Sequence, residues 1–254
     1  MNRALIFAKN KFVSMVVRIP SPRLHLAVSA KYLGEDISGL SGLKRRGFEP
    51  TVIFDVGASY GIWSNAVSKV FPHANYYLFE PLVDHLPIYQ KYLGVVLSMH
   101  PNFQIHKVAV GDRSGKVKMY TEPNMFGSTS LDMSGSEMFT PLEVPMIRLD
   151  EAVGELNLPV PQLMKIDIQG GELAVLEGFR QHLREVEVLL LETWLIRGYG
   201  TQTPTLLELS NWLLDYGFHL ADFTGCYRGA DGTLEAQDCI FINQKSQLYK
   251  NKVI

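Results

Sequence analysis

The sequence is poor in several features that would assign it to a special class of protein. Among its 254 residues, only Cys226 and Cys239 are cysteines. Two cysteines exclude a disulfide framework and a zinc site made of cysteines alone, although one bridge between them stays open. So few cysteines favour a reducing compartment, and we expect a cytoplasmic protein. No apolar run reaches the ~20 residues that span a bilayer.

Charge of either sign is also not in excess. Lysine and arginine number 24 against 26 acidic residues, so the formal net charge is −2. This balance gives no basis for expecting a nucleic-acid partner. Hydrophobic residues make up 46% of the chain and charged residues 20%, which is typical of a folded globular protein. The length fits one large α/β domain or two small domains.

The amino-terminal part has a different composition. Residues 1–34 contain six basic residues and no acidic one, which leaves 18 basic and 26 acidic residues elsewhere. On a helical wheel, Leu5, Phe12 and Val16 share an apolar face. Two interpretations stay open: a basic amphipathic segment in peripheral contact with an anionic membrane, or a helix or frayed end that caps the domain. The predicted boundaries are a basic, helical extension at 1–46, a domain at 47–245 and a tail at 246–254.

From residue 51 onward, β-rich runs alternate with helical periodicity. Strands are predicted at 51–56, 75–79, 103–110, 162–168, 186–192, 218–223 and 239–243. Helices are predicted at 25–46, with interruptions near Gly39 and Gly42, and at 62–71, 82–93, 171–183 and 205–216. Such alternation is typical of a parallel sheet covered by helices on both faces. The last two strands have no helix between them, which predicts an antiparallel partner at the end of the chain.

A long insertion, at about 111–151, separates the third and fourth strands. It contains two further β-rich runs at 116–120 and 144–149, and a loop at 127–130. The insertion could bind an acceptor molecule or pack a small core of its own; its large apolar residues are Tyr120, Met125, Phe126, Met133, Met138 and Phe139. Trp194 and Tyr199, after the fifth strand, could stack on a sugar ring or belong to the core.

The stretch Asp55-Val-Gly-Ala-Ser-Tyr-Gly61 follows a predicted strand and opens a predicted helix. Gly57 and Gly61 let the backbone turn sharply and approach a ligand closely. The G-x-G-x-x-G spacing of dinucleotide-binding proteins is absent, which argues against a nicotinamide-dependent oxidoreductase. The carboxylate of Asp55 suits an ammonium group, and the helix N-terminus suits a carboxylate. Together they match the amino-acid end of S-adenosylmethionine; a structural turn capped by Asp55 is the alternative.

Glu80 ends the second predicted strand, 19 residues after Gly61. A carboxylate at that place can accept hydrogen bonds from both hydroxyls of a ribose. Acids at the ends of two neighbouring strands, on either side of a glycine turn, form a more specific pattern than either acid alone. A solvated carboxylate before Pro81 is the alternative for Glu80.

The stretch Lys165-Ile-Asp-Ile-Gln-Gly-Gly-Glu172 follows the same plan at the fourth strand. Lys165 and Asp167 share one face of a strand by the period of two. Charged residues inside a sheet cost free energy unless they are paired or contact a ligand. We therefore expect Asp167 at the carboxyl edge of the sheet, with Glu192 on the same edge and Glu172 at a helix start. The alternative is a purely structural pair of Lys165 and Asp167.

These motifs together resemble the FkbM family of S-adenosylmethionine-dependent methyltransferases. The resemblance rests on Asp55–Gly61, Phe79-Glu-Pro81, Val108-Ala-Val-Gly-Asp112 and Lys165–Glu172, which occur in the family's order, and it covers about residues 40–245. Two positions depart from the family pattern. Ser59 stands where the family commonly has Asn, and Gly171 stands where Ala is frequent.

The resemblance implies a Rossmann-like class I methyltransferase sheet of seven strands, the last one antiparallel, with helices on both faces. It implies S-adenosyl-L-methionine as cofactor and methyl transfer to an oxygen of a sugar, glycan or other natural product. Asp167 would lie near the methyl group or the amino-acid end. The residues implied to hold the cofactor are Asp55, Gly57, Ala58, Ser59, Gly61, Glu80, Pro81, Ala109, Val110 and Asp167.

An alcohol needs a base near its proton at neutral pH. We expect that base among Asp167, Glu172 and Glu192, with Lys165 balancing the charge. His85, in a predicted helix, and His106 are weaker candidates. We predict no bound metal, although acids near Asp167 could ligate Mg²⁺.

A different class of protein stays open. A methyltransferase fold without activity could dock on a membrane or a glycan-assembly complex through its basic amino terminus. Such a protein would bind no S-adenosylmethionine, or would bind it without turnover. The sequence does not fix the oligomeric state.

Overall fold

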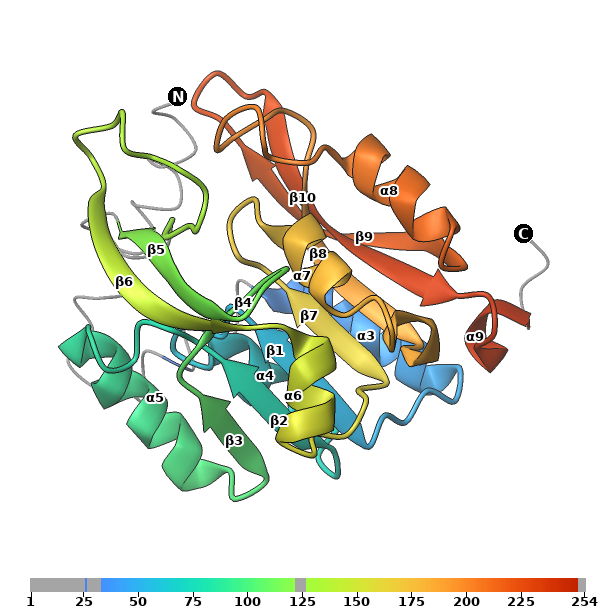
Figure 1. Ribbon diagram of the computed structural model, residues 1–254. Helices are drawn as coiled ribbons and strands as arrows, with labels where there is room; N and C mark the ends of the chain where they lie inside the picture. Colours follow the sequence, from blue (N-terminus) through green and yellow to red (C-terminus); the bar gives the residue numbers. More distant parts are fainter. Residues whose placement is uncertain (1–25, 27–32, 122–126, 251–254) are drawn as a thin grey trace.

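The computed structural model describes residues 26, 33–121 and 127–250. Its centre is a seven-stranded sheet in the order β3-β2-β1-β7-β8-β10-β9. The strands β3, β2, β1, β7 and β8 are parallel neighbours, whereas β10 is antiparallel to both β8 and β9. The predicted mixed sheet with an antiparallel last strand is confirmed. Figure 1 shows helices on both sides of this sheet.

The bounds of the elements follow the chain. The strands of the main sheet are β1 (Val52–Val56), β2 (Asn75–Phe79), β3 (Phe103–His106), β7 (Leu163–Ile166), β8 (Val188–Trp194), β9 (Phe218–Arg228) and β10 (Leu234–Asn243). The helices are α3 (Gly34–Arg45), α4 (Ile62–Val67), α5 (Pro87–Met99), α6 (Leu149–Glu155), α7 (Glu172–Gly178), α8 (Leu206–Leu214) and α9 (Gln247–Lys250), with a short 3₁₀ turn η2 (Leu183–Glu185).

Two hydrophobic cores lie on the two faces of the main sheet. Successive residues of a strand point to opposite faces, so Ile53 and Phe54 of β1 belong to different cores. The first core joins the sheet to α3, α4, α5 and α9. The second core joins it to α6, α7 and α8. Because both faces are covered, the central strands are apolar along most of their length.

The insertion, together with the two residues before it, forms a second, three-stranded sheet in the order β4-β6-β5, with β4 (Ala109–Val110), β5 (Gly115–Thr121) and β6 (Thr140–Ile147). Figure 1 shows this small sheet beside the carboxyl edge of the main one. Its apolar face packs against Tyr60, Leu82 and two tyrosines of α5. The small sheet therefore rests on the loops that follow β1 and β2.

The structure corrects several predicted boundaries. The single strand predicted at 103–110 is two strands, β3 in the main sheet and β4 in the small one, because the chain leaves the main sheet at residues 107–108. The helix predicted at 82–93 begins at Pro87, where proline suits the first turn, so His85 lies in a turn. The strand predicted at 144–149 ends at Ile147, and helix α6 (Leu149–Glu155), which was not predicted, follows it.

The predicted interruption of the first helix is wrong. Helix α3 runs unbroken through Gly39 and Gly42. A Cβ on Gly39 would lie 2.8 Å from Cγ2 of Thr224 and 3.0 Å from Cδ1 of Ile240. Gly39 therefore serves the close packing of α3 against β9 and β10 and does not break the helix.

Two other expectations concern cysteine and membranes. Cys226 is exposed and Cys239 is buried, and both are free thiols. Among the described residues, no helix combines the length and hydropathy needed to cross a bilayer. The amphipathic face predicted around Leu5, Phe12 and Val16 lies outside the described residues.

The contact between α7 and the loop after β4 gives a first testable prediction. A Cβ on Gly178 would lie 2.0 Å from the backbone oxygen of Gly111. Backbone cannot yield as a side chain does, so Gly178→Ala should lower the free energy of unfolding by ~1–3 kcal/mol. Gly154→Ala is the matched control, because nothing lies within 4 Å of a Cβ on Gly154 in α6. That change should raise stability by up to ~1 kcal/mol. Urea denaturation measures both, and equal stability of the two variants would contradict the prediction.

Candidate active site

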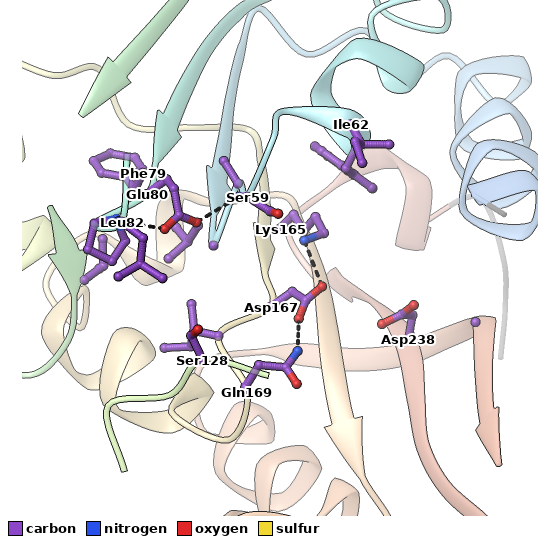
Figure 2. Close-up of a pocket in the computed structure, with 18 of the residues that line it drawn as sticks. Ser59, Ile62, Phe79, Glu80, Leu82, Ser128, Lys165, Asp167, Gln169 and Asp238 are labelled. Atoms are coloured by element: carbon purple, nitrogen blue, oxygen red, sulfur yellow. Dashed lines mark hydrogen bonds and ion pairs between the residues drawn. The ribbon is translucent and has the colours of Figure 1, made fainter. Parts of the chain in front are cut away.

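A pocket of about 540 Å³ opens at the carboxyl edge of β1, β2 and β7, the edge at which open α/β sheets bind ligands. Its volume is in the range of small-molecule sites. The wall continues onto α3, β4, β9 and β10. Figure 2 shows Lys165 and Asp167 between Glu80 on one side and Asp238 on the other.

The turn after β1 is shaped by residues with positive φ. Gly57 has φ of 82°, Ser59 of 50° and Gly61 of 72°. A Cβ on Gly57 would lie 2.0 Å from the backbone oxygen of Asp167, so only glycine lets this turn pack on the loop after β7. Ser59 is a non-glycine residue in the left-handed region, which Asn tolerates better than Ser. The backbone thus accounts for the preference for Asn that the family resemblance implies at this position.

Glu80 is fixed by the backbone of both neighbouring loops. Its Oε2 accepts a hydrogen bond from the backbone N–H of Ser59 at 2.9 Å, and its Oε1 accepts one from Leu82, also at 2.9 Å. The side chain lines the pocket and is 5% exposed. Burial raises the pKa of Glu80 to about 7, although the two backbone donors favour the charged form. Each oxygen keeps a lone pair that a ligand hydroxyl could use.

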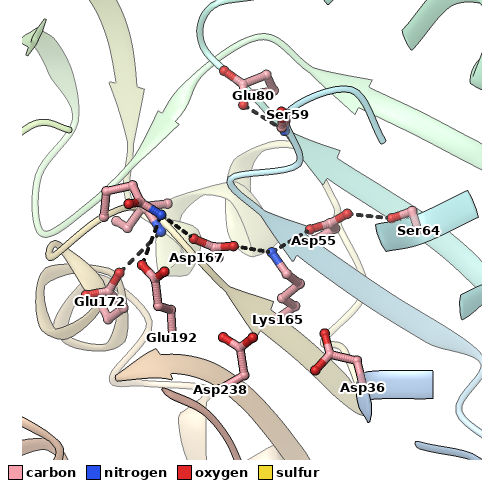
Figure 3. Close-up of polar contacts among 12 residues, drawn as sticks. Asp36, Asp55, Ser59, Ser64, Glu80, Lys165, Asp167, Glu172, Glu192 and Asp238 are labelled. Atoms are coloured by element: carbon pink, nitrogen blue, oxygen red, sulfur yellow. Dashed lines mark hydrogen bonds and ion pairs between the residues drawn. The ribbon is translucent and has the colours of Figure 1, made fainter. Parts of the chain in front are cut away.

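A buried lysine joins the ends of β1 and β7. Asp55 and Lys165 are register partners on these neighbouring strands. The Nζ of Lys165 lies 3.7 Å from Oδ1 of Asp55 and 3.3 Å from Oδ2 of Asp167, and it lies 5.8 Å from the ring centroid of Trp63. Figure 3 shows Lys165 between the two carboxylates. This charge pair fixes Asp167 at the floor of the pocket.

The charge of Lys165 is maintained by these carboxylates. Burial opposes the charged form, but Asp167 and Asp55 outweigh it and raise the pKa of Lys165. Burial raises the pKa of Asp55 as well, against the attraction of Lys165. The hydroxyl of Ser64 donates a hydrogen bond of 2.6 Å to Oδ2 of Asp55. Asp55 is completely buried and lies behind the pocket wall.

Gln169 links a carboxylate that lines the pocket to one that lies behind its wall. Its Nε2 donates hydrogen bonds to Oδ1 of Asp167 at 2.7 Å and to Oε2 of Glu192 at 3.0 Å. Its Oε1 accepts a hydrogen bond of 2.6 Å from the hydroxyl of Tyr199. The residue has φ of 62° and lies in the loop between β7 and α7. The amide therefore separates two acids that would otherwise repel each other.

Glu172 holds the same loop from the other side. Its Oε1 accepts hydrogen bonds from the backbone N–H groups of Ile168 at 3.2 Å and Gly170 at 3.1 Å. Burial, followed by the charge of Glu192, raises the pKa of Glu172 to about 8. Neither Glu172 nor Glu192 is among the residues that line the pocket. The geometry does not support the expectation that either is the base, and gives them a role in positioning the loop.

The predicted site residues thus separate into two groups. Those that line the pocket are Gly57, Ala58, Ser59, Glu80, Pro81, Ala109, Val110, Lys165 and Asp167. Those that lie behind its wall are Asp55, Gly61, Glu172 and Glu192. Ala109 and Val110 reach the pocket from β4 of the small sheet, not from the end of the third strand as expected. Gly61 is the N-cap of α4, and a Cβ there would lie 3.1 Å from side-chain carbons of Leu93 and Val96.

Sequence reasoning missed the part of the wall that α3, β9 and β10 supply. Asp36 of α3 is 4% exposed and accepts a hydrogen bond of 2.6 Å from the hydroxyl of Thr224. Asp238 of β10 is 8% exposed and accepts one of 2.7 Å from the hydroxyl of Tyr227. The sequence offered a signal for Asp238, an acid directly before the apolar run Cys239–Ile242, where burial costs free energy. Asp36 stands beside Glu35 in the first turn of α3, where acids are common, and gave no such signal.

Part of the insertion packs in a cluster that it shares with β8 and β10, and not in a core of its own. Tyr120, Met133 and Phe139 are buried together with Trp194 and Tyr199. Trp194 and Tyr199 are therefore core residues, and not an open platform for a sugar ring. Met138 is exposed, and two other residues named for the insertion, Met125 and Phe126, lie outside the described residues. The pocket receives Met119, Ser128 and Ser130 from this region.

No metal centre is formed by the part of the chain that the structure describes. Within residues 26, 33–121 and 127–250, no group of three or more His, Cys, Asp or Glu side chains is arranged to hold an ion. His106, one of the weaker base candidates, stacks on Phe79 with ring centroids 5.0 Å apart, and burial lowers the pKa of its imidazole.

Comparisons with known proteins agree with this geometry. A family model described as the methyltransferase FkbM domain matches residues 55–220. Methyltransferase 1 of Beauveria bassiana is 23% identical over 179 residues, which are 63% of this chain and 71% of that protein. The 2-O-methyltransferase NoeI of Sinorhizobium fredii is 24% identical over 155 residues, 56% of this chain. The chain spans 62% of that relative, less than two thirds of its length.

Among solved structures, magnesium protoporphyrin IX methyltransferase (ChlM) from Synechocystis PCC 6803 with bound SAM matches with a TM-score of 0.50. The identity is 12%, over 85% of this chain and 79% of that one. This likeness concerns the fold, which is the class I methyltransferase fold that the sequence motifs predicted.

The buried carboxyl of Glu172 gives a prediction on pH and stability. Its pKa is about 8 in the folded protein and ~4.3 in an unfolded chain. As the pH rises between these values, the unfolded state loses its proton first, so the wild type loses stability. Glu172→Gln removes this loss. The variant should gain ~5 kcal/mol relative to wild type between pH 4 and pH 9.

Urea denaturation across that pH range measures the difference. Glu177→Gln, at an exposed position of the same helix, should keep a constant difference from wild type. A Glu172→Gln difference that does not change with pH would show that this carboxyl titrates normally.

Proposed function

Because the chain belongs to the FkbM family of S-adenosylmethionine-dependent methyltransferases, we propose that it methylates a hydroxyl oxygen of a sugar, glycan or other natural product. One observation carries the proposal. Glu80 is buried in the pocket wall at the end of β2, and backbone donors of the two neighbouring loops fix both of its oxygens. A fixed carboxylate at this edge of the sheet is suited to the two hydroxyls of a ribose.

The residues of the pocket fit S-adenosylmethionine. Gly57, Ala58 and Ser59 bring backbone to the pocket beside Glu80, which suits the amino-acid end of the cofactor. Ala109 and Val110 supply an apolar surface from β4 that suits an adenine ring, and Pro81 borders the ribose side. When bound, the cofactor supplies a methyl group on a positively charged sulfur.

Asp55 acts in this scheme through Lys165 and not by direct contact. Its carboxylate compensates the charge of Lys165, and Lys165 holds Asp167 at the pocket floor. Asp167 then offers a carboxylate near the place of the methionyl ammonium and the sulfonium. Asp55 is therefore a positioning residue, and Asp167 is the acid of this pair that faces the ligand.

Oxygen as the methyl acceptor is supported by a relative. The NoeI protein of Sinorhizobium fredii is named a 2-O-methyltransferase. An oxygen nucleophile attacks a methyl group in line with its leaving group, so the enzyme must align both partners and exclude water. The described pocket extends past Asp167 toward α3, β9 and β10, which leaves room for an acceptor beside the cofactor.

Calorimetric titration with S-adenosylmethionine and S-adenosylhomocysteine tests this proposal. Wild type should bind both ligands. Glu80→Gln should bind them ~10–100-fold more weakly, because it loses hydrogen bonds to a charged group. Binding by wild type should also strengthen from pH 6 to pH 8, since the carboxyl of Glu80 has a pKa of about 7, whereas the variant should change little over this range.

Glu177→Gln is the matched control and should bind as wild type does. Absence of binding by folded wild type would contradict the proposed function and favour a methyltransferase fold without activity. Equal affinities of wild type and Glu80→Gln would leave the family assignment intact but refute the role of Glu80.

A further inference from the structure

The pocket has two ends, and the proposed cofactor accounts for only one of them. The loops after β1 and β2 and the strand β4 form the end that contains Glu80. The other end is formed by α3, β9 and β10, and it contains Asp36, Tyr227 and Asp238. Lys165 and Asp167 lie between the two ends, as Figure 2 shows for Glu80 and Asp238. A methyl group held near Asp167 would therefore point to an acceptor at the second end.

Asp238 differs from the other pocket acids in how it is held. Glu80 accepts two backbone hydrogen bonds, and Asp167 is paired with Lys165. Oδ2 of Asp238 accepts a hydrogen bond from the Tyr227 hydroxyl. No lysine or arginine of the described chain forms an ion pair with Asp238, and no described residue donates a hydrogen bond to its Oδ1. A carboxylate without a cation is a better proton acceptor than one in a salt bridge.

The neighbouring strand leaves space for this carboxylate. Gly225 of β9 is the register partner of Asp238. A Cβ on Gly225 would lie 2.3 Å from Oδ2 of Asp238 and 3.0 Å from its Cγ. Any side chain at position 225 would therefore displace the carboxylate from its place beside Tyr227. Asp238 also shares its strand face with Ile240 and Ile242, so it continues an apolar row up to the pocket.

Charged groups from every neighbouring element act on Asp238. Asp36 faces it from α3, Lys165 and Asp167 from β7, Tyr227 from β9, and Glu192 is its register partner on β8. Burial, followed by the charges of Asp36 and Asp167, raises the pKa of Asp238 to about 7. A general base works best with a pKa near the working pH.

Building on the proposed function, we propose that the end of the pocket formed by α3, β9 and β10 binds an uncharged or amino sugar, and that Asp238 accepts the proton of its hydroxyl. The acceptor O–H bond breaks and its proton goes to Asp238. An oxygen lone pair forms the bond to the methyl carbon, and the electrons of the carbon–sulfur bond remain on sulfur. Asp36 binds the acceptor and sets the charge around Asp238.

The charge of this wall determines the class of acceptor. Acidic side chains that line this end of the pocket are Glu35, Asp36 and Asp238, against one basic side chain, Arg228. Hydroxyl and ammonium groups can donate to these carboxylates, whereas the carboxylate of a uronic acid would be repelled. The acceptor is therefore expected to carry hydroxyl or amino groups and no acid.

Transfer of tritium from methyl-labelled S-adenosylmethionine tests this. The probes are methyl glucoside, methyl fucoside, methyl glucosaminide and glucuronate. The full chain should methylate at least one of the first three and not glucuronate. Its kcat should rise with pH through about 7. Asp238→Asn should lower kcat ~100-fold or more and abolish this rise, while it binds S-adenosylhomocysteine as wild type does.

Asp36→Asn should shift the pH dependence of kcat, which the loss of a purely structural contact would not do. Removal of a neighbouring negative charge lowers the pKa of Asp238, so the rise of kcat should shift to lower pH. Asp231→Asn, in the exposed turn between β9 and β10, is the matched control and should leave the profile unchanged.

The outcomes distinguish a failure of the proposed function from a failure of the present inference. A wild type that fails to bind S-adenosylhomocysteine contradicts the proposed function itself. A wild type that binds it but methylates none of the three sugars, or prefers glucuronate, overturns only the present inference. So does an Asp238→Asn variant that keeps the rate and the pH profile.

Discussion

The buried ammonium group of Lys165 is the constraint on which the rest of the site depends. A lysine in the middle of a parallel sheet is tolerated only when carboxylates compensate its charge. Asp55 from β1 and Asp167 at the end of β7 provide that compensation at 3.7 and 3.3 Å. The charges therefore fix two neighbouring strand ends relative to each other. Removing Lys165 would leave two acids facing each other without a compensating charge.

The position of Lys165 and its two carboxylates is coupled to the rest of the pocket by packing. Gly57 lies against the backbone oxygen of Asp167, so the turn after β1 and the loop after β7 cannot move independently. The turn after β1 in turn holds Glu80 through the backbone N–H of Ser59. The position of the Glu80 carboxylate in the pocket wall therefore depends on the ion pairs at the pocket floor as well as on its own backbone donors. Fold and site are specified here by the same few residues.

The sequence was sufficient for features that depend on local pattern. The alternation of strands and helices predicted the main sheet, and the period of two placed Lys165 and Asp167 together. The sequence was insufficient where residues far apart along the chain come together in the fold. Asp36 and Asp238 are about 200 positions apart, and only the packing of α3 on β9 and β10 brings them to one wall. Glu172 and Glu192 carried a plausible sequence signal, but burial behind the loop removes them from the pocket.

The hydrogen bonds of Gln169 allow only one orientation of its side-chain amide. Nitrogen faces the carboxylates of Asp167 and Glu192, and oxygen faces Tyr199. Rotation of the amide by half a turn would bring its oxygen against two acids, so only one arrangement of its hydrogens is stable. Tyr199 belongs to the cluster that anchors the insertion. The amide therefore joins the carboxylate of Asp167, through Tyr199, to the cluster that anchors the insertion, so the position of each depends on the other.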